Sequence, residues 1–254
     1  MLQKLKTLEN TLHANIKGQE HVVAEILPII SRGELGLSDR LRPKGSFLFV
    51  GPTGTGKTEL TKLFTEHLFG EEKLARIDMS EFSDGEALSR LLGNQNDPKG
   101  VLGHLLEKTE QSGTFLFDEI EKANRSVLDL LLQVLDASRI TLFDKSVVSF
   151  SNYYVVCTSN IGTARIAELP KASSSAKERI ITEALEQTLR PEFLGRFSKR
   201  VVFESLSFKI QREICQTLVE KELKRLAEAG YANLECDDSA INALFLGGYS
   251  EKYG

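Results

Sequence analysis

Short uninterrupted apolar runs alternate along most of the chain with longer stretches in which apolar residues recur every three or four positions. An uninterrupted run predicts a strand that is buried on both faces, whereas the recurring pattern predicts a helix with one buried side. The runs that predict strands are Ser46–Val50, Leu74–Ile77, Thr114–Phe117, Tyr153–Thr158 and Arg200–Phe203. Strands that alternate with helices indicate a mainly parallel α/β sheet with flanking helices.

Helical spacing predicts a leading helix over residues 1–14 and a helix between most pairs of strands. These predicted helices are Glu20–Ser31, Leu60–Leu68, Glu86–Leu92, Val101–Glu110, Arg125–Asp136 and Glu178–Leu189. Ala172–Ala176, rich in alanine and serine, predicts a loop. After Ser205 only helical patterns follow, chiefly Phe208–Glu228. We therefore expect a large α/β domain over 1–204 and a smaller, mostly helical and incomplete domain over 205–254.

One glycine-rich loop joins the first predicted strand to a predicted helix. It reads Gly51-Pro52-Thr53-Gly54-Thr55-Gly56-Lys57-Thr58 and fits the phosphate-loop pattern G-x-x-x-x-G-K-[ST]. Its glycines let the backbone N–H groups turn toward a phosphate, and the positive end of the following helix dipole favours the same anion. Lys57 is expected to reach the outer phosphates, and the hydroxyl of Thr58 to join a Mg²⁺ shell. The sequence thus predicts a nucleoside triphosphate site rather than a plain glycine turn.

Three polar residues end two other predicted strands, where ligands of open α/β sheets bind. Asp118 and Glu119 follow Thr114–Phe117, and Asn160 follows Tyr153–Thr158. We expect Asp118 to hold Mg²⁺, partly through water, and Glu119 to polarise the attacking water. The amide of Asn160 is expected to orient that water or to contact the γ-phosphate, although a simple turn is an alternative.

An arginine that stabilises transition-state charge is a frequent companion of such sites. Arg196 is the first candidate for this arginine finger and Arg190 is the second, with an ordinary surface charge as the alternative.

The overall composition is that of a soluble globular protein, with 41% hydrophobic and 27% charged residues and a net charge of −4. No basic run is interleaved with aromatic residues, so we expect neither a nucleic-acid partner nor a membrane surface. The three cysteines are widely spaced and indicate buried thiols in a reducing, cytoplasmic compartment. The four histidines are scattered without ligand spacing, which disfavours a histidine metal site.

Several further segments share a pattern with a known family. They are Arg42–Phe49, Arg76–Phe82, Phe117–Ala123, Leu131–Asp136, Thr158–Asn160 and Leu189–Phe193. Together with the phosphate loop, they resemble an AAA+ ATPase, and specifically the C-terminal ATPase module of the Clp family of protein-unfolding machines. The resemblance covers roughly residues 12–254.

This resemblance implies ATP as the nucleotide, Asn160 in the sensor 1 role, and Arg196 as a finger supplied to a neighbour's ATP. It also implies a homo-oligomeric ring, usually a hexamer, and a protein substrate or adaptor. Adenine is expected to pack near Ile16, Gly18 and Gln19, with ordinary core as the alternative for Ile16.

The chain departs from the family pattern at three places. Clp unfoldases carry a pore loop with an aromatic between glycines, but Gly93–Gly100 has no aromatic residue. The second pore loop usually contains a glycine turn, whereas Leu142–Ser146 has none, and its Phe143 is expected in a core or interface more than as a substitute. The sensor 2 arginine follows a Tyr-Gly-Ala-Arg motif, and the sequence stops at Tyr253-Gly254. We expect the chain to be part of a longer protein, with a natural end as the alternative.

The sequence therefore predicts an ATP-hydrolysing module of a Clp-like protein-remodelling enzyme. The alternative is a nucleotide-gated assembly or interaction protein that turns over slowly or only with a partner. The non-aromatic Asn94–Lys99 loop favours this alternative, whereas Asp118, Glu119 and Arg196 favour hydrolysis.

Overall fold

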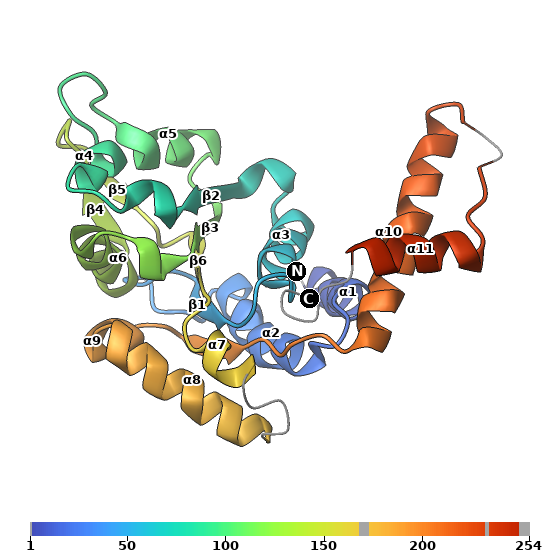
Figure 1. Cartoon of the computed structure of the whole chain (residues 1–254). Helices are drawn as coiled ribbons and strands as arrows, with labels where there is room; N and C mark the ends of the chain where they lie inside the picture. Colours follow the sequence, from blue (N-terminus) through green and yellow to red (C-terminus); the bar gives the residue numbers. More distant parts are fainter. Residues whose placement is uncertain (1, 168–172, 232–233, 249–254) are drawn as a thin grey trace.

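The computed structural model describes residues 2–167, 173–231 and 234–248 of the chain. Its centre is a five-stranded sheet in which every neighbouring pair of strands is parallel (Figure 1). In spatial order the strands are β2 (Leu74–Asp78), β3 (Gly113–Asp118), β6 (Tyr153–Ser159), β1 (Gly45–Val50) and β7 (Lys199–Val202). All five therefore end at the same edge of the sheet.

The inner strands are buried along their whole length because each of their faces packs against helices. Along β1, Phe47 and Phe49 join one buried cluster, and Leu48 and Val50 join the other. The first cluster also includes residues of α1 (Leu2–Asn15), α2 (Glu20–Glu34) and α3 (Lys57–Leu68). The second includes residues of α4 (Ala87–Leu92), α5 (Gly100–Lys108), α6 (Arg125–Ala137), α7 (Thr163–Ala167), α8 (Ser174–Thr188) and α9 (Pro191–Leu194). The large domain is a three-layer α/β/α structure, and the predicted fold is confirmed.

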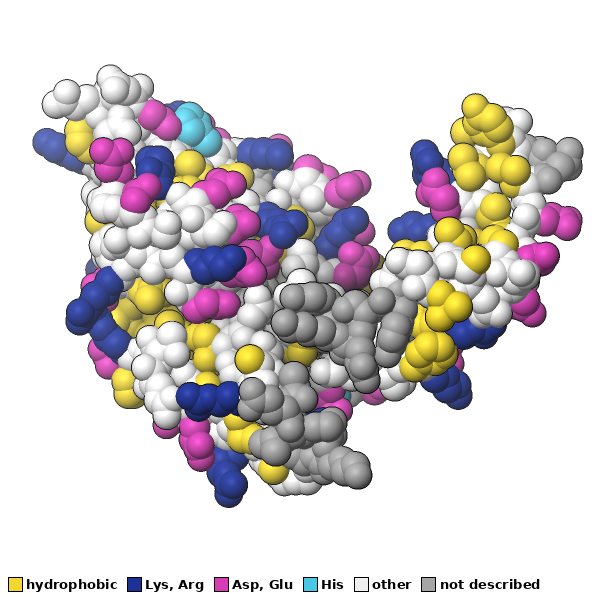
Figure 2. All heavy atoms as spheres, in the orientation of Figure 1, with side chains coloured by type: hydrophobic (Ala, Val, Ile, Leu, Met, Phe, Trp, Pro, Cys, Tyr) yellow, Lys and Arg dark blue, Asp and Glu magenta, His cyan; other side chains and the backbone are white. Residues whose placement is uncertain are grey.

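Two helices follow the sheet and stand beside the α/β layers (Figure 1). They are α10 (Phe208–Glu228) and α11 (Asp238–Gly248), joined by an edge-to-face contact between Phe208 and Phe245 with ring centroids 4.8 Å apart. Hydrophobic side chains gather on this arm in Figure 2, and Leu218, Leu244 and Leu246 are exposed. The arm lies within residues 205–254, the range predicted for a helical domain, of which 232–233 and 249–254 lie outside the described part.

A few elements differ from the sequence-based predictions. A small antiparallel hairpin of β4 (Arg139–Thr141) and β5 (Val147–Ser149) was not predicted, because strands this short carry too little pattern. Three 3₁₀ turns were also missed: η1 (Glu71–Lys73), η2 (Met79–Phe82) and η3 (Ile120–Lys122). The predicted Ala172–Ala176 loop is wrong from Ser174, where α8 begins, and Ala172 lies outside the described residues.

The start of α8 has a clear local cause. The hydroxyl of Ser173 accepts a hydrogen bond from the N–H of Ala176 at 3.3 Å, so this serine caps a helix where composition had suggested a loop. At the last strand, Phe203 lies just past β7, and its N–H donates to the carbonyl of Val50 at 2.7 Å. Within the described residues, no helix is long and apolar enough to span a bilayer.

Candidate functional site

The glycine-rich loop leaves the end of β1 and enters α3 with two residues in the left-handed region. Gly54 has a φ of 82° and Gly56 a φ of 100°, which glycine adopts without steric cost. The hydroxyl of Thr55 donates to the carbonyl of Pro52 at 2.8 Å and closes the turn. The loop is therefore shaped by its own residues, and Thr58 follows directly in the first turn of α3.

Lys57 lies beneath this loop and is only 8% exposed. Its ammonium group donates to the carbonyls of Gly51 and Pro52, the latter at 2.8 Å, and to Oδ1 of Asn160 at 3.0 Å. Burial lowers the pKa of Lys57 to about 8, although the charges of three nearby carboxylates, Glu121, Asp118 and Glu119, act in the opposite direction.

Asp118 ends β3 and is nearly buried, at 5% exposure. Its Oδ1 accepts from the hydroxyl of Thr158 at 2.8 Å, and its Oδ2 accepts from Nε of Arg76 at 2.6 Å. Both carboxylate oxygens thus have a donor from a neighbouring strand, which is what a buried carboxylate requires.

Glu119 turns away from the strand with a φ of 57°, a backbone conformation that few residues other than glycine adopt. Its Oε1 accepts from Nδ2 of Asn160 at 3.0 Å, and its Oε2 accepts from Nζ of Lys122 at 2.6 Å. Because the other end of the Asn160 amide accepts from Lys57, this asparagine links the phosphate-loop lysine to Glu119. The three predicted residues Lys57, Glu119 and Asn160 therefore lie together.

A cleft of about 530 Å³ opens over these groups at the carboxyl edge of the sheet. Its lining residues are Thr53, Gly54, Gly56, Lys57, Thr58, Glu59, Arg76, Asp78, Asp118, Glu119, Thr158 and Asn160. No cluster of three or more His, Cys, Asp or Glu suited to a metal occurs in the described parts of the chain. A hydroxyl from Thr58 and a carboxylate from Asp118 nevertheless fit Mg²⁺, which binds proteins through few oxygen ligands and fills its shell with phosphate and water.

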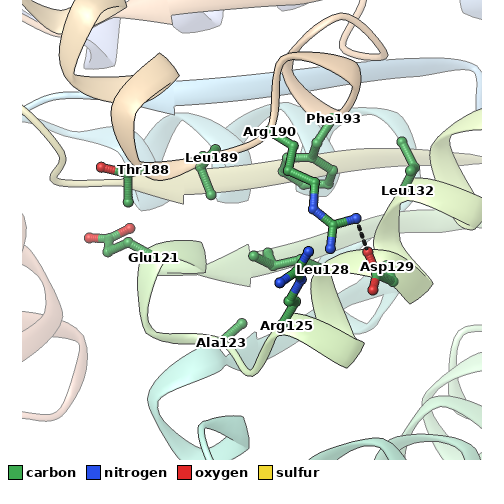
Figure 3. Close-up of a pocket in the computed structure, with 10 residues that line it drawn as sticks. All are labelled: Glu121, Ala123, Arg125, Leu128, Asp129, Leu132, Thr188, Leu189, Arg190 and Phe193. Atoms are coloured by element: carbon green, nitrogen blue, oxygen red, sulfur yellow. Dashed lines mark hydrogen bonds and ion pairs between the residues drawn. The ribbon is translucent and has the colours of Figure 1, made fainter.

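The predicted arginines lie away from this cleft. The carbonyl of Arg196 accepts from the hydroxyl of Ser46 at 3.3 Å, beside the amino ends of β1 and β7, and its guanidinium pairs with Asp136 at 3.2 Å. Arg190 lines a separate hollow of about 420 Å³, where it donates to Asp129 at 2.7 Å (Figure 3). Neither arginine lines the cleft that contains Lys57.

The residues predicted near adenine lie where α1, α2 and α10 approach one another. Ile16 is buried within a core cluster. Gly18 has a φ of 71°, and a Cβ atom added there would come within 2.6 Å of Ile210. Gln19 is fully buried, and its amide group both donates to and accepts from the backbone of Glu204, at 2.7 and 3.2 Å. Their contact with adenine stays a prediction.

Three contributing residues were not singled out from the sequence. Arg76 and Thr158 both hold Asp118, and the Oε1 of Glu121 accepts from the backbone N–H of Asn160 at 3.0 Å. Glu121 was within reach of sequence reasoning, because it lies in the same acidic run as Asp118 and Glu119. Arg76 offered a weaker signal, a charged residue between the apolar residues Ala75 and Ile77 of a strand.

A phosphate loop after β1, two acids at the end of β3 and an asparagine after β6 together define a P-loop nucleotide-binding protein. Comparison with known proteins agrees with this class. The family model described as "AAA domain (Cdc48 subfamily)" matches residues 42–200. The chain therefore belongs to the AAA family.

Individual relatives extend the similarity over nearly the whole chain. The chain is 39% identical to the chaperone protein ClpB of Bacteroides thetaiotaomicron, over 99% of its own length and 30% of that protein. It is 38% identical to the ATP-binding subunit ClpC of the Clp protease of Staphylococcus aureus, over 99% of this chain and 32% of that protein. The fold matches Hsp104 of S. cerevisiae in its ADP complex, with a TM-score of 0.84 and 33% identity over 99% of this chain and 45% of that chain.

These matches confirm the resemblance to Clp-type ATPases that the sequence motifs indicated. The chain spans only about a third of the length of the curated relatives. Over that length it is similar to the ATPase module of Clp- and Hsp104-type proteins.

Proposed function

We propose that this module hydrolyses ATP to remodel other proteins and works as one subunit of a ring. The observation that carries the proposal is the hydrogen-bonded chain from Lys57 through Asn160 to Glu119. This chain connects Lys57, which is expected to bind the outer phosphates, to Glu119, which is expected to polarise the attacking water. The amide of Asn160 therefore contacts both residues.

The roles follow from the position of each group. The loop Thr53–Thr58 and Lys57 bind and orient the phosphates, and Thr58 and Asp118 would hold Mg²⁺, which supplies charge neutralisation at the phosphate oxygens when it is bound. The carboxylate of Glu119 lines the cleft and would accept a hydrogen bond from the attacking water, and the amide of Asn160 keeps that carboxylate oriented. Adenine would pack near Ile16, Gly18 and Gln19, at the junction with α10.

Arg196 is proposed to complete the site of a neighbouring subunit. Its backbone carbonyl lies beside the amino ends of β1 and β7 and its guanidinium pairs with Asp136, whereas the cleft of the same chain lies at the carboxyl edge. A side chain on the opposite edge cannot reach the phosphates bound by its own subunit. Its 39% exposure instead leaves it accessible to a second copy, which supports a ring of like subunits.

A protein substrate is the proposed target of this ATPase. One matched structure is a reconstruction of Hsp104 with ATPγS and FITC casein, with a TM-score of 0.88 and 33% identity. We propose by analogy that this module also acts on polypeptide, alone or through an adaptor, in the cytoplasm and without a nucleic-acid partner.

A nucleotide-gated assembly protein without threading is the second candidate, and one observation favours it. In the Gly93–Gly100 segment, Oδ1 of Asn94 accepts from the N–H groups of Asn96 and Asp97 at 2.9 and 3.1 Å. This segment is a closed polar turn that offers no aromatic side chain to a polypeptide.

ATP turnover per subunit, measured across a wide range of protein concentrations, tests the main proposal. Turnover is expected to rise steeply with concentration as sites are completed between subunits, and Glu119→Gln serves as the blank. Arg196→Ala alone should lose most ATP turnover. When Arg196→Ala and Glu119→Gln subunits are mixed, part of the turnover should return, because some interfaces then pair an intact Arg196 with an intact Glu119. Brisk turnover that does not depend on concentration would overturn the role of Arg196.

A further inference from the structure

Arg76 lies beside the nucleotide cleft, although no sequence motif placed it there. It is on β2, an edge strand that pairs with β3 so that Arg76 is opposite Leu116. Asp118 is two residues beyond Leu116 and therefore on the same face, within diagonal reach of Arg76. The contact is short, with Nε of Arg76 at 2.6 Å from Oδ2 of Asp118.

The pair is unequally exposed. The side chain of Asp118 is 7% exposed, whereas that of Arg76 is 58% exposed and lines the open cleft. A nearly buried carboxylate depends on its cation far more than an exposed guanidinium depends on its anion. Arg76 can therefore exchange Asp118 for water readily, while Asp118 needs a replacement cation when Arg76 leaves.

The charge balance of the cleft gives this pair a role. Among the described residues that line it, four are acidic, namely Glu59, Asp78, Asp118 and Glu119, and two are basic, namely Lys57 and Arg76. A nucleoside triphosphate adds several negative charges to a lining that already has an excess of acids. Arg76 supplies one of the two positive charges there, next to the carboxylate that would otherwise repel the phosphates most directly.

We propose that Arg76 is a positioning residue of the nucleotide site that acts through Asp118. It neutralises Asp118 so that nucleotide binds without Mg²⁺, and it competes with Mg²⁺ for the same carboxylate. This inference rests on the proposed function, because it assigns Asp118 to the metal. Its consequence is a defined order, in which the site accepts nucleotide with Arg76 on Asp118 and gives up that contact as the metal enters.

Removal of Arg76 is expected to have opposite consequences with and without the metal. In Arg76→Gln, the uncompensated Asp118 repels the phosphates, so affinity for a fluorescent ATP analogue in EDTA should fall about tenfold or more. With saturating Mg²⁺ the metal provides the missing charge, and affinity should stay within about threefold of the unmodified chain. The Mg²⁺ concentration that gives half of the gain in affinity for the analogue should be lower in Arg76→Gln, because no guanidinium competes with the metal for Asp118.

Two variants separate this role from mere folding. Arg179→Gln removes an exposed guanidinium that lies 3.8 Å from Glu183 on α8, outside the cleft, and should change neither condition. Asp118→Asn removes the charge that Arg76 neutralises, so in that background Arg76→Gln should alter metal-free affinity less than about twofold. The double variant also leaves no buried charge unpaired, and it keeps the test valid should Arg76→Gln fold poorly.

The outcomes are distinguishable. Equal losses of affinity in Arg76→Gln with and without Mg²⁺ would mean that Arg76 contacts the phosphates directly. Unchanged metal-free affinity would mean that the Arg76–Asp118 pair is only structural. Either result overturns the inference. Failure of the unmodified chain to bind the analogue, or binding that survives Lys57→Ala unchanged, would instead overturn the assignment of the nucleotide site itself.

Discussion

Asn160 accepts one hydrogen bond, from Lys57, and donates two, to Glu119 and Glu121, and these bonds fix its side chain and its backbone N–H. Its amide lies between Lys57 and Glu119, and its N–H donates to Oε1 of Glu121 at 3.0 Å. The second oxygen of Glu121, Oε2, is buried with no hydrogen-bond partner. Glu121 therefore acts on the site through its bond to the backbone of Asn160 and through its charge, which favours the ammonium form of Lys57.

Substitution of Glu121 should therefore affect hydrolysis more than binding. In Glu121→Ala the N–H of Asn160 loses its acceptor, at a cost of about 1–3 kcal/mol, and the amide no longer holds Glu119 in register. We expect kcat to fall about tenfold with KM changed less than about threefold, as measured in steady-state ATPase assays.

Glu121→Gln is the matched control, because it keeps an acceptor oxygen in the same shape without the charge. The kcat of Glu121→Gln should therefore stay close to that of the unmodified chain, in contrast to the kcat of Glu121→Ala. If both variants are equally impaired, the charge of Glu121, rather than its bond to Asn160, is what hydrolysis requires.

At the scale of elements, sequence reasoning succeeded where chemistry is contiguous. The phosphate loop and the pair Asp118-Glu119 are each one segment, and the strands that carry them are apolar because both faces are covered. Sequence reasoning was less successful where a contact joins two strands. The bond from Arg76 to Asp118 depends on the pairing of β2 with β3, and the bond from Thr158 depends on the pairing of β3 with β6. No single-sequence pattern specifies such a register.

The hairpin of β4 and β5 is the element that the pattern missed, and it changes the interpretation of Phe143. Phe143 was expected in a core or an interface; a core position is wrong, since Phe143 is 51% exposed, and an interface position stays a prediction. Its N–H donates to the carbonyl of Leu92 at 2.9 Å, and the N–H of Asp144 donates to the carbonyl of Pro98 at 3.2 Å. The hairpin tip and the Gly93–Gly100 segment are thus joined, and Phe143 is the aromatic side chain that this joined surface presents.

If the module grips polypeptide, Phe143 should contribute the apolar contact that the polar turn lacks. We expect Phe143→Ser to weaken binding of fluorescein-labelled casein about fivefold or more, measured by anisotropy with a slowly hydrolysed ATP analogue. Basal ATP turnover and the melting temperature should change little, because the side chain is exposed.

Leu37→Ser provides the control, since Leu37 is 64% exposed in the segment that leads toward β1. Casein binding that is unaffected by Phe143→Ser, or reduced equally by both variants, would favour the assembly-protein alternative.

On the scale of the whole molecule, the α10–α11 arm meets the phosphate loop across a largely apolar hollow of about 410 Å³. Gly54 of the loop lines this hollow together with Ile214, Cys215 and Leu218 of α10. At the base of the arm, Ile210 packs over Gly18, and a Cβ atom added to this glycine would come within 2.6 Å of the Ile210 side chain. We therefore expect the arm and the phosphate loop to close on a ligand bound at the loop, as the two sides of a hinge do.

Thiol labelling can follow this closure, because the three cysteines differ in environment. Cys157 is buried in β6, and burial raises the pKa of its thiol, so less thiolate exists at any pH than in an ordinary cysteine and Cys157 should not react in the native protein. Cys215 and Cys236 are partly exposed and should react with a maleimide near pH 8. Saturating MgATP should slow the labelling of Cys215 about fivefold or more and leave Cys236 unchanged, as read by peptide mass spectrometry. Lys57→Ala, which removes the expected contact with the phosphates, should abolish this protection. Protection of both Cys215 and Cys236 would instead indicate general tightening or assembly rather than closure over the nucleotide.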